Sequence, residues 1–303
     1  MKAWILAVGS EMLTPFKQDT NSLRITGRLN TLGYDVRMKA VVSDDTAEVA
    51  ALFSRGLGTV ELIVCTGGLG PTEDDVTRDA LARALSIPLD LDERVLAAIQ
   101  QRFEQRGLAM PAINRRQAMV PRGATIIENT RGTAPGLWIE AQGTGVLLLP
   151  GPPREMAPML EAVIEDRLRA RSEGRGLFRR VLRITGRSES DVDSVAGPIY
   201  MPWATEPVPI ATTILASMGQ IELHLTAVAA GEGEAARVLD PAVAALQEAL
   251  GPSVYSTDDQ AMEVVVGGLL LRHTMTIAVA ESCSGGLLAS RLTDVPGSSA
   301  YFD

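Results

Sequence analysis

The chain has 303 residues, enough for two or three domains that each bury a core of their own. Hydrophobic residues make up 46% and charged residues 21%, a balance typical of globular proteins that excludes a disordered chain. The net charge of −9 argues against general affinity for nucleic acid or anionic membranes, although backbone N–H groups can still bind an anionic small ligand.

Short apolar runs alternate with helical patterns through the first half of the chain. The expected strands are Ala3–Val8, Tyr34–Val42 and Val60–Cys65, and the expected helices are 19–32, Thr46–Leu57, Val76–Leu85 and Asp92–Arg106. This alternation predicts an α/β fold of three layers, a doubly wound and mainly parallel sheet with helices on both faces. Continuous hydrophobicity in Val60–Cys65 agrees, because such strands are buried on both sides.

Polar and turn-forming residues dominate between Gly107 and Gly136, which predicts a long loop of the kind that is often functional. Leu137–Glu140 and Val146–Leu149 then predict a hairpin. PGPPREM (Pro150–Met156) leads into a helix that ends in an arginine-rich stretch. We expect the first domain to cover residues 1–172.

The following residues predict a small α+β domain over 173–257. Its expected elements are a strand (Phe178–Thr185), a helix capped by Ser188, a hairpin (Ile210–Ala216 and Gln220–Ala229) turning at Met218–Gly219, and a helix (Glu232–Leu250). Residues 258–303 predict a helix (Glu263–Leu271), a strand (Thr276–Ala280) and a further helix start. Because about 40 residues complete no packed domain, we expect an incomplete α/β domain here and a chain that is a fragment of a longer protein.

Cys65 and Cys283 lie far apart in the sequence, as is typical of reduced thiols in a cytoplasmic protein. The apolar stretch near the N-terminus is too short for the core of a signal peptide. No uninterrupted apolar run approaches the roughly 18–20 residues of a membrane span. We therefore expect a soluble cytoplasmic protein.

The stretch TGGLGPTEDDVTRDA, Thr66–Ala80, directly follows a buried strand. Gly67, Gly68 and Gly70 let the backbone turn and bring its N–H groups together, and the next helix adds its own free N–H groups. The sequence thus predicts a phosphate-binding loop at the carboxyl edge of the sheet, without the lysine of a Walker loop. The alternative is a tight strand-to-helix turn that binds no ligand.

Acidic residues follow each of the three N-terminal strands: Glu11 and Asp19, Asp44 and Asp45, Asp74 and Asp75. In a doubly wound sheet these loops share one edge. Carboxylates repel a phosphate unless a divalent cation lies between them, and Mg²⁺ takes one or two carboxylates together with phosphate oxygens and water. The pattern therefore favours a metal site over solvated loop acids.

Several stretches together resemble the competence/damage-inducible protein CinA family, whose N-terminal domain is related to the molybdopterin-binding MoaB/MogA fold. They are VGSEML, DTNS (Asp19–Ser22), TGGLGPTEDDVTRDA, NRRQA (Asn114–Ala118), RGTAPG (Arg131–Gly136) and PGPPREM. The resemblance covers essentially the whole chain. It implies a metal-dependent ADP-ribose pyrophosphatase, then a KH-type domain, then a nicotinamide-nucleotide amidase domain that deamidates nicotinamide mononucleotide, in a homodimer.

The resemblance also implies roles for residues of the first domain. The phosphates of ADP-ribose would contact Gly67, Gly68, Gly70 and Thr72. The catalytic Asp75, with Glu11, Asp19 or Asp44, would hold the divalent metal cation, which would be Mg²⁺ or a transition metal such as Co²⁺ or Mn²⁺. The rest of the nucleotide or the attacking water would be contacted by Asn114, Arg115, Thr133 and Glu155. The hypothesis from another class is a non-catalytic module that binds a molybdopterin-like or nucleotide ligand.

The other two domains carry weaker functional signals. Residues 186–190 read GRSES and lack the GXXG clamp, so a nucleic-acid partner is not expected. AESCSGG (Ala280–Gly286) resembles the start of the amidase domain, with Ser282 at the position of its nucleophile. The lysine and tyrosine that would activate this serine follow later in the family, so we expect no amidase activity from this chain.

Overall fold

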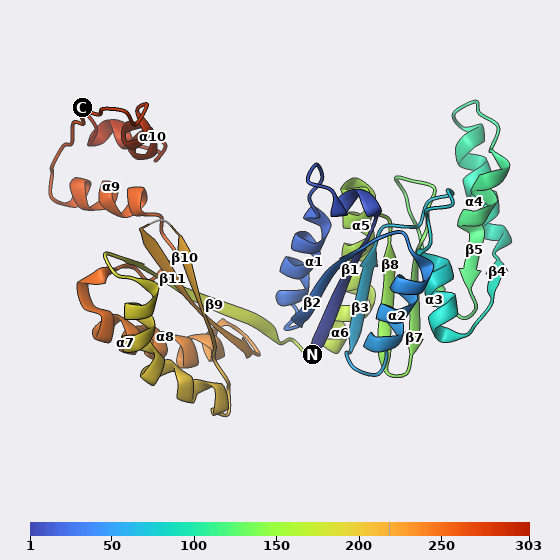
Figure 1. The fold of residues 1–303 in the computed structure, drawn as a ribbon, viewed down its shortest axis with the longest axis horizontal. Helices are drawn as coiled ribbons and strands as arrows, with labels where there is room; N and C mark the ends of the chain where they lie inside the picture. Colours follow the sequence, from blue (N-terminus) through green and yellow to red (C-terminus); the bar gives the residue numbers. More distant parts are fainter. Residues whose placement is uncertain (218) are drawn as a thin grey trace. The chain divides into compact units, whose positions relative to one another are not determined.

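The computed structural model describes residues 1–217 and 219–303, which divide into two compact units, Met1–Leu177 and Phe178–Asp303. Figure 1 labels most of the helices and strands of both units. The turn expected at Met218 lies outside the described residues.

A six-stranded sheet forms the middle of the first unit, in the order β2-β1-β3-β8-β7-β6. These strands are β1 (Lys2–Val8), β2 (Asp35–Val42), β3 (Leu62–Thr66), β6 (Thr125–Ile127), β7 (Gly136–Ala141) and β8 (Thr144–Leu149). β2, β1, β3 and β8 run parallel; β7 pairs antiparallel with β8, and the edge strand β6 pairs antiparallel with β7. Because β2 and β3 lie on opposite sides of β1, a crevice opens at the carboxyl ends of β1 and β3.

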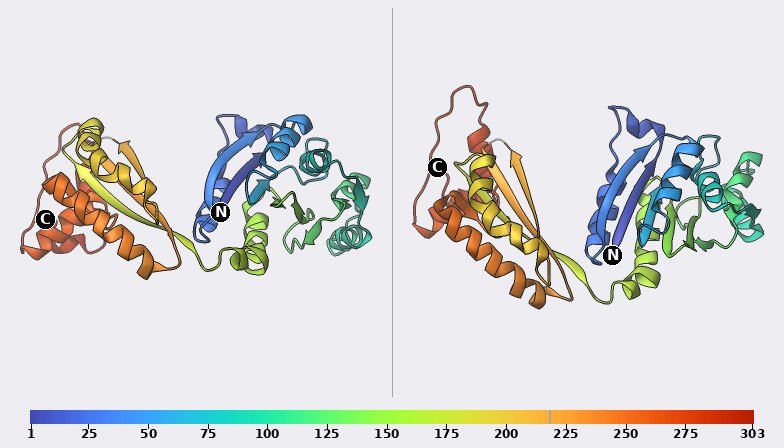
Figure 2. Two further views of the ribbon diagram at one scale, coloured as in Figure 1. Left: turned by 90° about the horizontal axis from the view of Figure 1, so that it is seen from below. Right: turned by 60° about the horizontal axis from the view of Figure 1, so that its bottom comes forward.

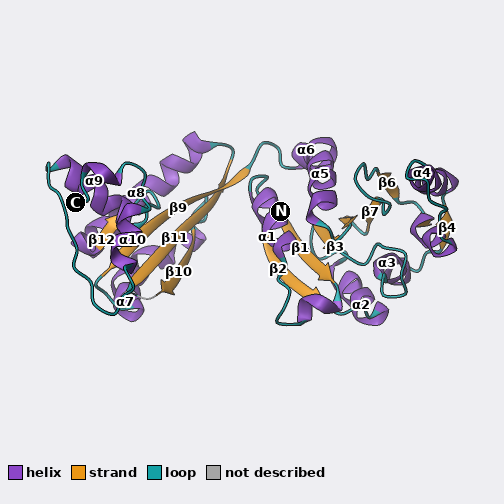
Figure 3. Ribbon diagram, turned by 90° about the horizontal axis from the view of Figure 1, so that it is seen from above, coloured by secondary structure: helices purple, strands orange, loops and turns teal. Residues whose placement is uncertain are grey.

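Helices cover both faces of this sheet (Figure 2, Figure 3). One face carries α1 (Thr20–Asn30) and α5 (Pro153–Val163), which a π-helical turn and α6 (Arg169–Arg171) extend; the other carries α2 (Thr46–Gly56) and α3 (Thr77–Leu85). Each face of the sheet has its own hydrophobic core, and neighbouring residues of β1 point into opposite cores. Ile5 packs with Ile25 of α1, and Leu6 packs with Phe53 of α2. The three-layer α/β fold expected from the sequence is confirmed.

The prediction of a long loop at Gly107–Gly136 is wrong. The segment contains a 3-10 helix (Ala112–Ala118), β5 (Met119–Pro121) and β6. β5 pairs with β4 (Leu89–Leu91), and α4 (Glu93–Glu104) packs on them around a small core of Val95, Leu96, Ile99 and Ala118. The strands of this lobe are only three residues long, too short for a periodic pattern to reveal.

The second unit contains a sheet in the order β10-β11-β9-β12. Its strands are β9 (Gly176–Thr185), β10 (Ala211–Ser217), β11 (Gln220–Ala229) and β12 (Val254–Ser256), and its main helices are α7 (Glu189–Tyr200) and α8 (Glu232–Leu250). The expected β-α-β-β-α order is confirmed, with β12 as an additional edge strand. Ser188 caps α7 as predicted, since its hydroxyl oxygen accepts a hydrogen bond from the Asp191 N–H at 3.2 Å.

Two further helices follow, α9 (Met262–Arg272) and α10 (Leu287–Thr293). The prediction of a strand at Thr276–Ala280 is wrong. Ile277 forms one isolated bridge with Phe302, because the described residues offer no neighbouring strand on which this segment could extend. Within the described ranges, no helix combines the length and the apolar composition that a membrane span requires.

Candidate functional site

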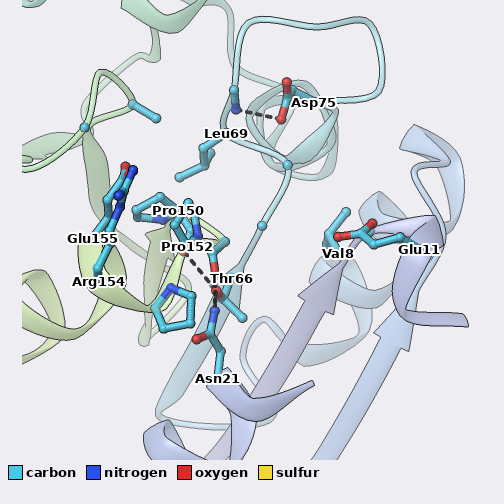
Figure 4. Close-up of a pocket in the computed structure, with 18 of the residues that line it drawn as sticks. Val8, Glu11, Asn21, Thr66, Leu69, Asp75, Pro150, Pro152, Arg154 and Glu155 are labelled. Atoms are coloured by element: carbon cyan, nitrogen blue, oxygen red, sulfur yellow. Dashed lines mark hydrogen bonds between the residues drawn. The ribbon is translucent and has the colours of Figure 1, made fainter. Parts of the chain in front are cut away.

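A cleft of about 790 Å³ opens at the carboxyl ends of β1 and β3 (Figure 4). Its walls come from the segment between β1 and α1, the glycine-rich loop after β3, the loop before β7, the lobe of α4 and the turn before α5. The charged residues that line it are Glu11, Lys17, Asp19, Asp44, Asp74, Asp75, Arg102, Arg106, Arg131, Arg154 and Glu155. The cleft thus lies where the strand order changes direction, the usual place for a ligand in such folds.

Gly67 and Gly68 give the glycine-rich loop its sharp turn. Both have positive φ angles, 98° and 64°. A Cβ at Gly67 would collide with the carbonyl oxygen of Val8, and a Cβ at Gly68 would collide with the hydroxyl of Thr77. Glycine is therefore required at both positions by the close approach of β1 and α3.

Side chains of α3 hold this loop in place. The Thr77 hydroxyl donates to the Gly67 carbonyl oxygen at 2.8 Å, and the Arg78 guanidinium donates to the carbonyl oxygens of Leu69 and Gly70, both at 2.7 Å. Arg78 is only 1% exposed, and its burial lowers the pKa of its guanidinium to about 10. With the carbonyl oxygens engaged, the N–H groups of Gly68 and Leu69 donate to none of the described residues.

Asp75 is the carboxylate that organises the rest of the loop. Its Oδ1 accepts from the Gly70 N–H at 2.6 Å, and its Oδ2 accepts from the N–H and the hydroxyl of Thr72 at 2.8 and 2.6 Å. The donors of Gly70 and Thr72, expected from the resemblance to contact phosphate, are thus directed at Asp75.

Arg116, the neighbour of the predicted Arg115, contacts the glycine-rich loop. Arg116 donates to the carbonyl oxygen of Thr72 at 3.0 Å and forms an ion pair with Asp79 at 3.2 Å. Arg115 is exposed and does not line the cleft. Asn114 is buried behind Gln117, to whose Oε1 it donates at 3.0 Å, and it is Gln117 that lines the cleft.

The three other predicted metal ligands each have a local partner. The Lys17 ammonium lies 2.9 Å from Glu11, and its hydrogen bond lowers the pKa of that carboxyl. Asp19 caps α1 by accepting from the Ser22 N–H at 2.9 Å. Asp44 accepts from the Ser10 N–H at 2.8 Å.

These acids line one cleft without converging. In the described part of the chain, no group of three or more His, Cys, Asp or Glu side chains is arranged to hold a metal ion. The residues present therefore do not form a metal cage made of protein ligands alone. They fit a cation that shares its ligands between one or two carboxylates and the phosphate of a substrate.

Glu155 and Thr133 lie on the opposite wall. Glu155, 9% exposed in the first turn of α5, accepts from Asn129 Nδ2 at 2.8 Å. Asn129 in turn accepts from the N–H groups of Arg131 and Gly132, which shapes the loop carrying Thr133. A Cβ at Gly132 would collide with the Glu155 carboxylate, so this glycine is required for the acid to occupy its position.

Sequence reasoning missed several buried polar side chains that shape the cleft, among them Asn21, Arg78 and Asn129. Asn21 Nδ2 donates to the Thr66 hydroxyl at 3.0 Å and to the Gly151 carbonyl oxygen, which ties α1 to the end of β3 and to the turn before α5 (Figure 4). The signal for Asn21 was its place inside DTNS, next to the capping Asp19. Nothing in the local pattern marks Asn129.

Ser282 belongs to the second unit, in the segment before α10. It is exposed, and its Oγ lies 3.7 Å from the sulfur of Cys283. A hydrogen bond from the Ser284 hydroxyl, together with those from the N–H groups of Ala289 and Leu288 at 2.8 and 2.9 Å, lowers the pKa of Glu281. Within the described residues, no base makes a hydrogen bond to Ser282.

The fold and the cleft define the first unit as an α/β domain of the molybdopterin-binding type, and a family model described as "Probable molybdopterin binding domain" matches residues 4–170. A "Damage-inducible protein CinA KH domain" matches residues 179–256, and a "CinA C-terminal domain" matches residues 259–303. The chain belongs to the CinA family.

Individual relatives agree with this assignment. The chain is 45% identical over 303 residues to a CinA-like protein of Solibacter usitatus, covering 100% of this chain and 72% of the relative. It is 42% identical over 305 residues to a competence-damage inducible protein of Symbiobacterium thermophilum, covering 71% of that protein. A crystal structure of CinA from Thermoplasma acidophilum is similar over 55% of this chain and 98% of its own, with 36% identity and a TM-score of 0.52.

Proposed function

We propose that the first unit hydrolyses ADP-ribose to AMP and ribose 5-phosphate with the help of a divalent cation. One observation carries the proposal: a single cleft combines several carboxylates with the N–H groups of Gly68 and Leu69, which donate to none of the described residues. The N–H groups suit a diphosphate, and the carboxylates suit a cation that accompanies it. Membership of the CinA family supports the same choice of substrate.

In this proposal Glu155 is the residue that accepts a proton from the attacking water. Its Oε2 is held by Asn129, and its Oε1 accepts no hydrogen bond from the described residues. The water oxygen bonds to one phosphorus, the bridging P–O bond breaks, and the water proton passes to Glu155 Oε1. The N–H groups of Gly68 and Leu69 stabilise the negative charge that develops on the phosphoryl oxygens.

The cation would be held by one or two of Glu11, Asp19 and Asp44. Each of these keeps one carboxylate oxygen that accepts no hydrogen bond from the described residues, whereas both oxygens of Asp75 are engaged. When bound, a divalent cation neutralises the diphosphate and polarises its phosphoryl groups. Asp75 would then act mainly by fixing the loop.

The test is to incubate the protein with ADP-ribose and Mg²⁺, Mn²⁺ or Co²⁺ and to measure AMP by chromatography. AMP formation that stops when EDTA removes the metal is the expected result. Binding of ADP-ribose without turnover under all three metals would favour the other hypothesis, a non-catalytic module for a molybdopterin-like or nucleotide ligand. In a longer protein, the same proposal links this activity to deamidation of nicotinamide mononucleotide by the C-terminal domain.

We also propose that the protein is a homodimer. Large apolar side chains are exposed on its last two helices, among them Leu269, Leu271, Leu287 and Leu288. A second copy that covers such surface would remove it from water. Light scattering is expected to give twice the chain mass of 32.2 kDa, and a mass of 32.2 kDa at working concentration would contradict the proposal.

A further inference from the structure

The cleft has an acidic wall and a basic wall. Glu11, Asp19, Asp44, Asp74 and Asp75 all come from the loops that follow β1, β2 and β3. Arg102, Arg106, Arg131 and Arg154 come from α4 with the residues just after it, from the loop before β7, and from α5. In Figure 4, Glu11 and Asp75 lie on one side of the cleft and Arg154 on the other.

The arginines of the basic wall gather around the loop of residues 129–134. Arg102 donates to the carbonyl oxygen of Asn129 at 2.9 Å. Arg131 belongs to this loop and donates to the carbonyl oxygen of Arg154 at 3.3 Å. Arg106 lies four residues after Arg102, where it also lines the cleft.

None of these four arginines forms an ion pair with a described residue. This is notable in a protein of net charge −9, whose arginines elsewhere are often paired with carboxylates, as Arg28 is with Glu161 and Arg122 is with Asp90. Glu155 lies on this wall as well, but its Oε2 is bound to Asn129. The wall therefore presents an excess of positive charge to a ligand.

The proposed hydrolysis gives the diphosphate no contact with the four arginines of the basic wall. The N–H groups of Gly68 and Leu69, with the acidic wall and a cation, already suffice for one diphosphate. Guanidinium groups bind phosphate through paired N–H donors, and unpaired guanidinium groups facing a cleft gain most from a doubly charged phosphomonoester. The basic wall thus has the chemistry of a second, separate anion site.

We propose that Arg102, Arg106, Arg131 and Arg154 form a subsite for a phosphomonoester carried by the ligand in addition to its diphosphate. The preferred substrates are nucleoside diphosphate sugars with a further phosphate on one of their ribose rings. This inference rests on the proposed function for the identity of the diphosphate half of the ligand.

The experiment compares kcat/KM for ADP-ribose with kcat/KM for its 2′-phosphate and for its 1″-phosphate. At least one phosphorylated compound is expected to be preferred by about 10-fold, as one strong charge-assisted contact allows. In the double variant R102Q/R106Q this ratio falls towards one. In Arg24→Gln, which changes an exposed arginine of α1 outside the cleft, the ratio is retained.

Two results would overturn the inference: equal kcat/KM for all three compounds in the unaltered protein, or a preference that survives in R102Q/R106Q. A proportional loss for all three compounds in that variant would mean that the arginines bind the diphosphate itself, which also overturns it. The same ratios are measured as binding constants by calorimetry. If the protein does not turn over ADP-ribose, the proposed function is overturned. The preference for an additional phosphate can then still be measured from the binding constants.

Discussion

Asp75 and Arg78 bind the two backbone polar groups of Gly70, its N–H and its carbonyl oxygen. Asp75 accepts a hydrogen bond from the Gly70 N–H at 2.6 Å, and Arg78 donates one to the Gly70 carbonyl oxygen at 2.7 Å. Asp75 lies just before α3 and Arg78 lies in its first turn, so the N-terminal end of one helix fixes both the N–H and the carbonyl oxygen of Gly70. The conformation of the glycine-rich loop is thereby set without a ligand.

The Arg78→Met variant tests how much this anchor contributes to stability. Removing the guanidinium leaves the carbonyl oxygens of Leu69 and Gly70 without their donor, so the free energy of unfolding is expected to fall by about 2–3 kcal/mol. The free energy of unfolding is measured by urea denaturation. Arg83→Met, an exposed arginine of the same helix, is the matched control and is expected to stay within about 0.5 kcal/mol. A loss equal to that of the control would contradict the prediction.

The Asp75→Asn variant is expected to be destabilised as well as less active. The sequence alone suggests a loop substitution without structural cost, but three hydrogen bonds end on this carboxylate. An amide can replace only part of this acceptor, so we expect a loss of about 1–2 kcal/mol and slower ADP-ribose hydrolysis. Asp74→Asn, whose carboxylate is exposed and makes no side-chain hydrogen bond in the described chain, is the control. Unchanged turnover in Asp75→Asn would remove this residue from the mechanism.

The Glu155→Gln variant removes the negative charge of this cleft residue while keeping a side chain of nearly the same size and shape. Glutamine keeps an oxygen that can accept from Asn129 Nδ2, so the fold and its melting temperature are expected to change little. Hydrolysis of ADP-ribose is expected to fall by about 10²–10⁴-fold, the usual contribution of a general base. Glu161→Gln, on the same helix but paired with Arg28, should retain activity. A variant with normal kcat would show that another group accepts the proton.

The two cysteines are expected to differ sharply in reactivity. Cys65 is buried in β3, and burial raises the pKa of its thiol to about 12, whereas Cys283 is exposed. Because the thiolate is the reactive form, an aromatic disulfide reagent at pH 8 should label one cysteine per folded chain and the second only after unfolding. Rapid labelling of two cysteines, or retention of full labelling in Cys283→Ala, would contradict this.

The same thiol gives stability a defined pH dependence. The folded pKa of Cys65 lies above its unfolded value, so the folded state holds the proton more tightly. Its contribution to stability is fully present below the unfolded pKa of about 8.5 and is lost as pH rises towards 12. A Cys65→Ala variant should therefore show a flatter decline in the free energy of unfolding at alkaline pH than the unaltered protein.

A protein of residues 1–303 is expected to release no ammonia from nicotinamide mononucleotide. Ser282 is exposed, and among the described residues its Oγ lies within hydrogen-bonding distance only of the Cys283 sulfur, so none of them is placed as a base to activate its hydroxyl. An enzymatic ammonia assay with Ser282→Ala as the reference measures any activity. Ammonia release that this substitution abolishes would mean that a base comes from within these residues, with His273 the first to examine.

The sequence revealed most of the fold because strands, helices and turns leave local patterns. The continuous apolar run ending at Cys65, followed by Gly67 and Gly68, identified both the buried strand and the loop that lines the cleft. Which of Arg115 and Arg116 contacts that loop was not predictable, because only the 3-10 turn decides which side chain faces it.

The acids illustrate the same limit. Topology predicted that Glu11, Asp19 and Asp44 would lie at one edge, and all three line the cleft. Their carboxylates nevertheless face Lys17, Ser22 and Ser10. The contact of Asp19 with Ser22 is a helix cap that the sequence indicates, but no spacing in the sequence encodes the contacts of Glu11 and Asp44. A shared edge therefore does not establish a shared metal ion.

The crowding around Gly67, Gly68 and Gly132 changes how variation among relatives should be interpreted. Each glycine is required by a neighbour inside the protein, namely the Val8 oxygen, the Thr77 hydroxyl and the Glu155 carboxylate. If relatives keep glycine at these positions, packing inside the protein explains it, whichever compound the cleft binds. The Arg106 side chain makes no hydrogen bond or ion pair with a described residue, so a lineage that changed its substrate would be free to replace this arginine while keeping every glycine.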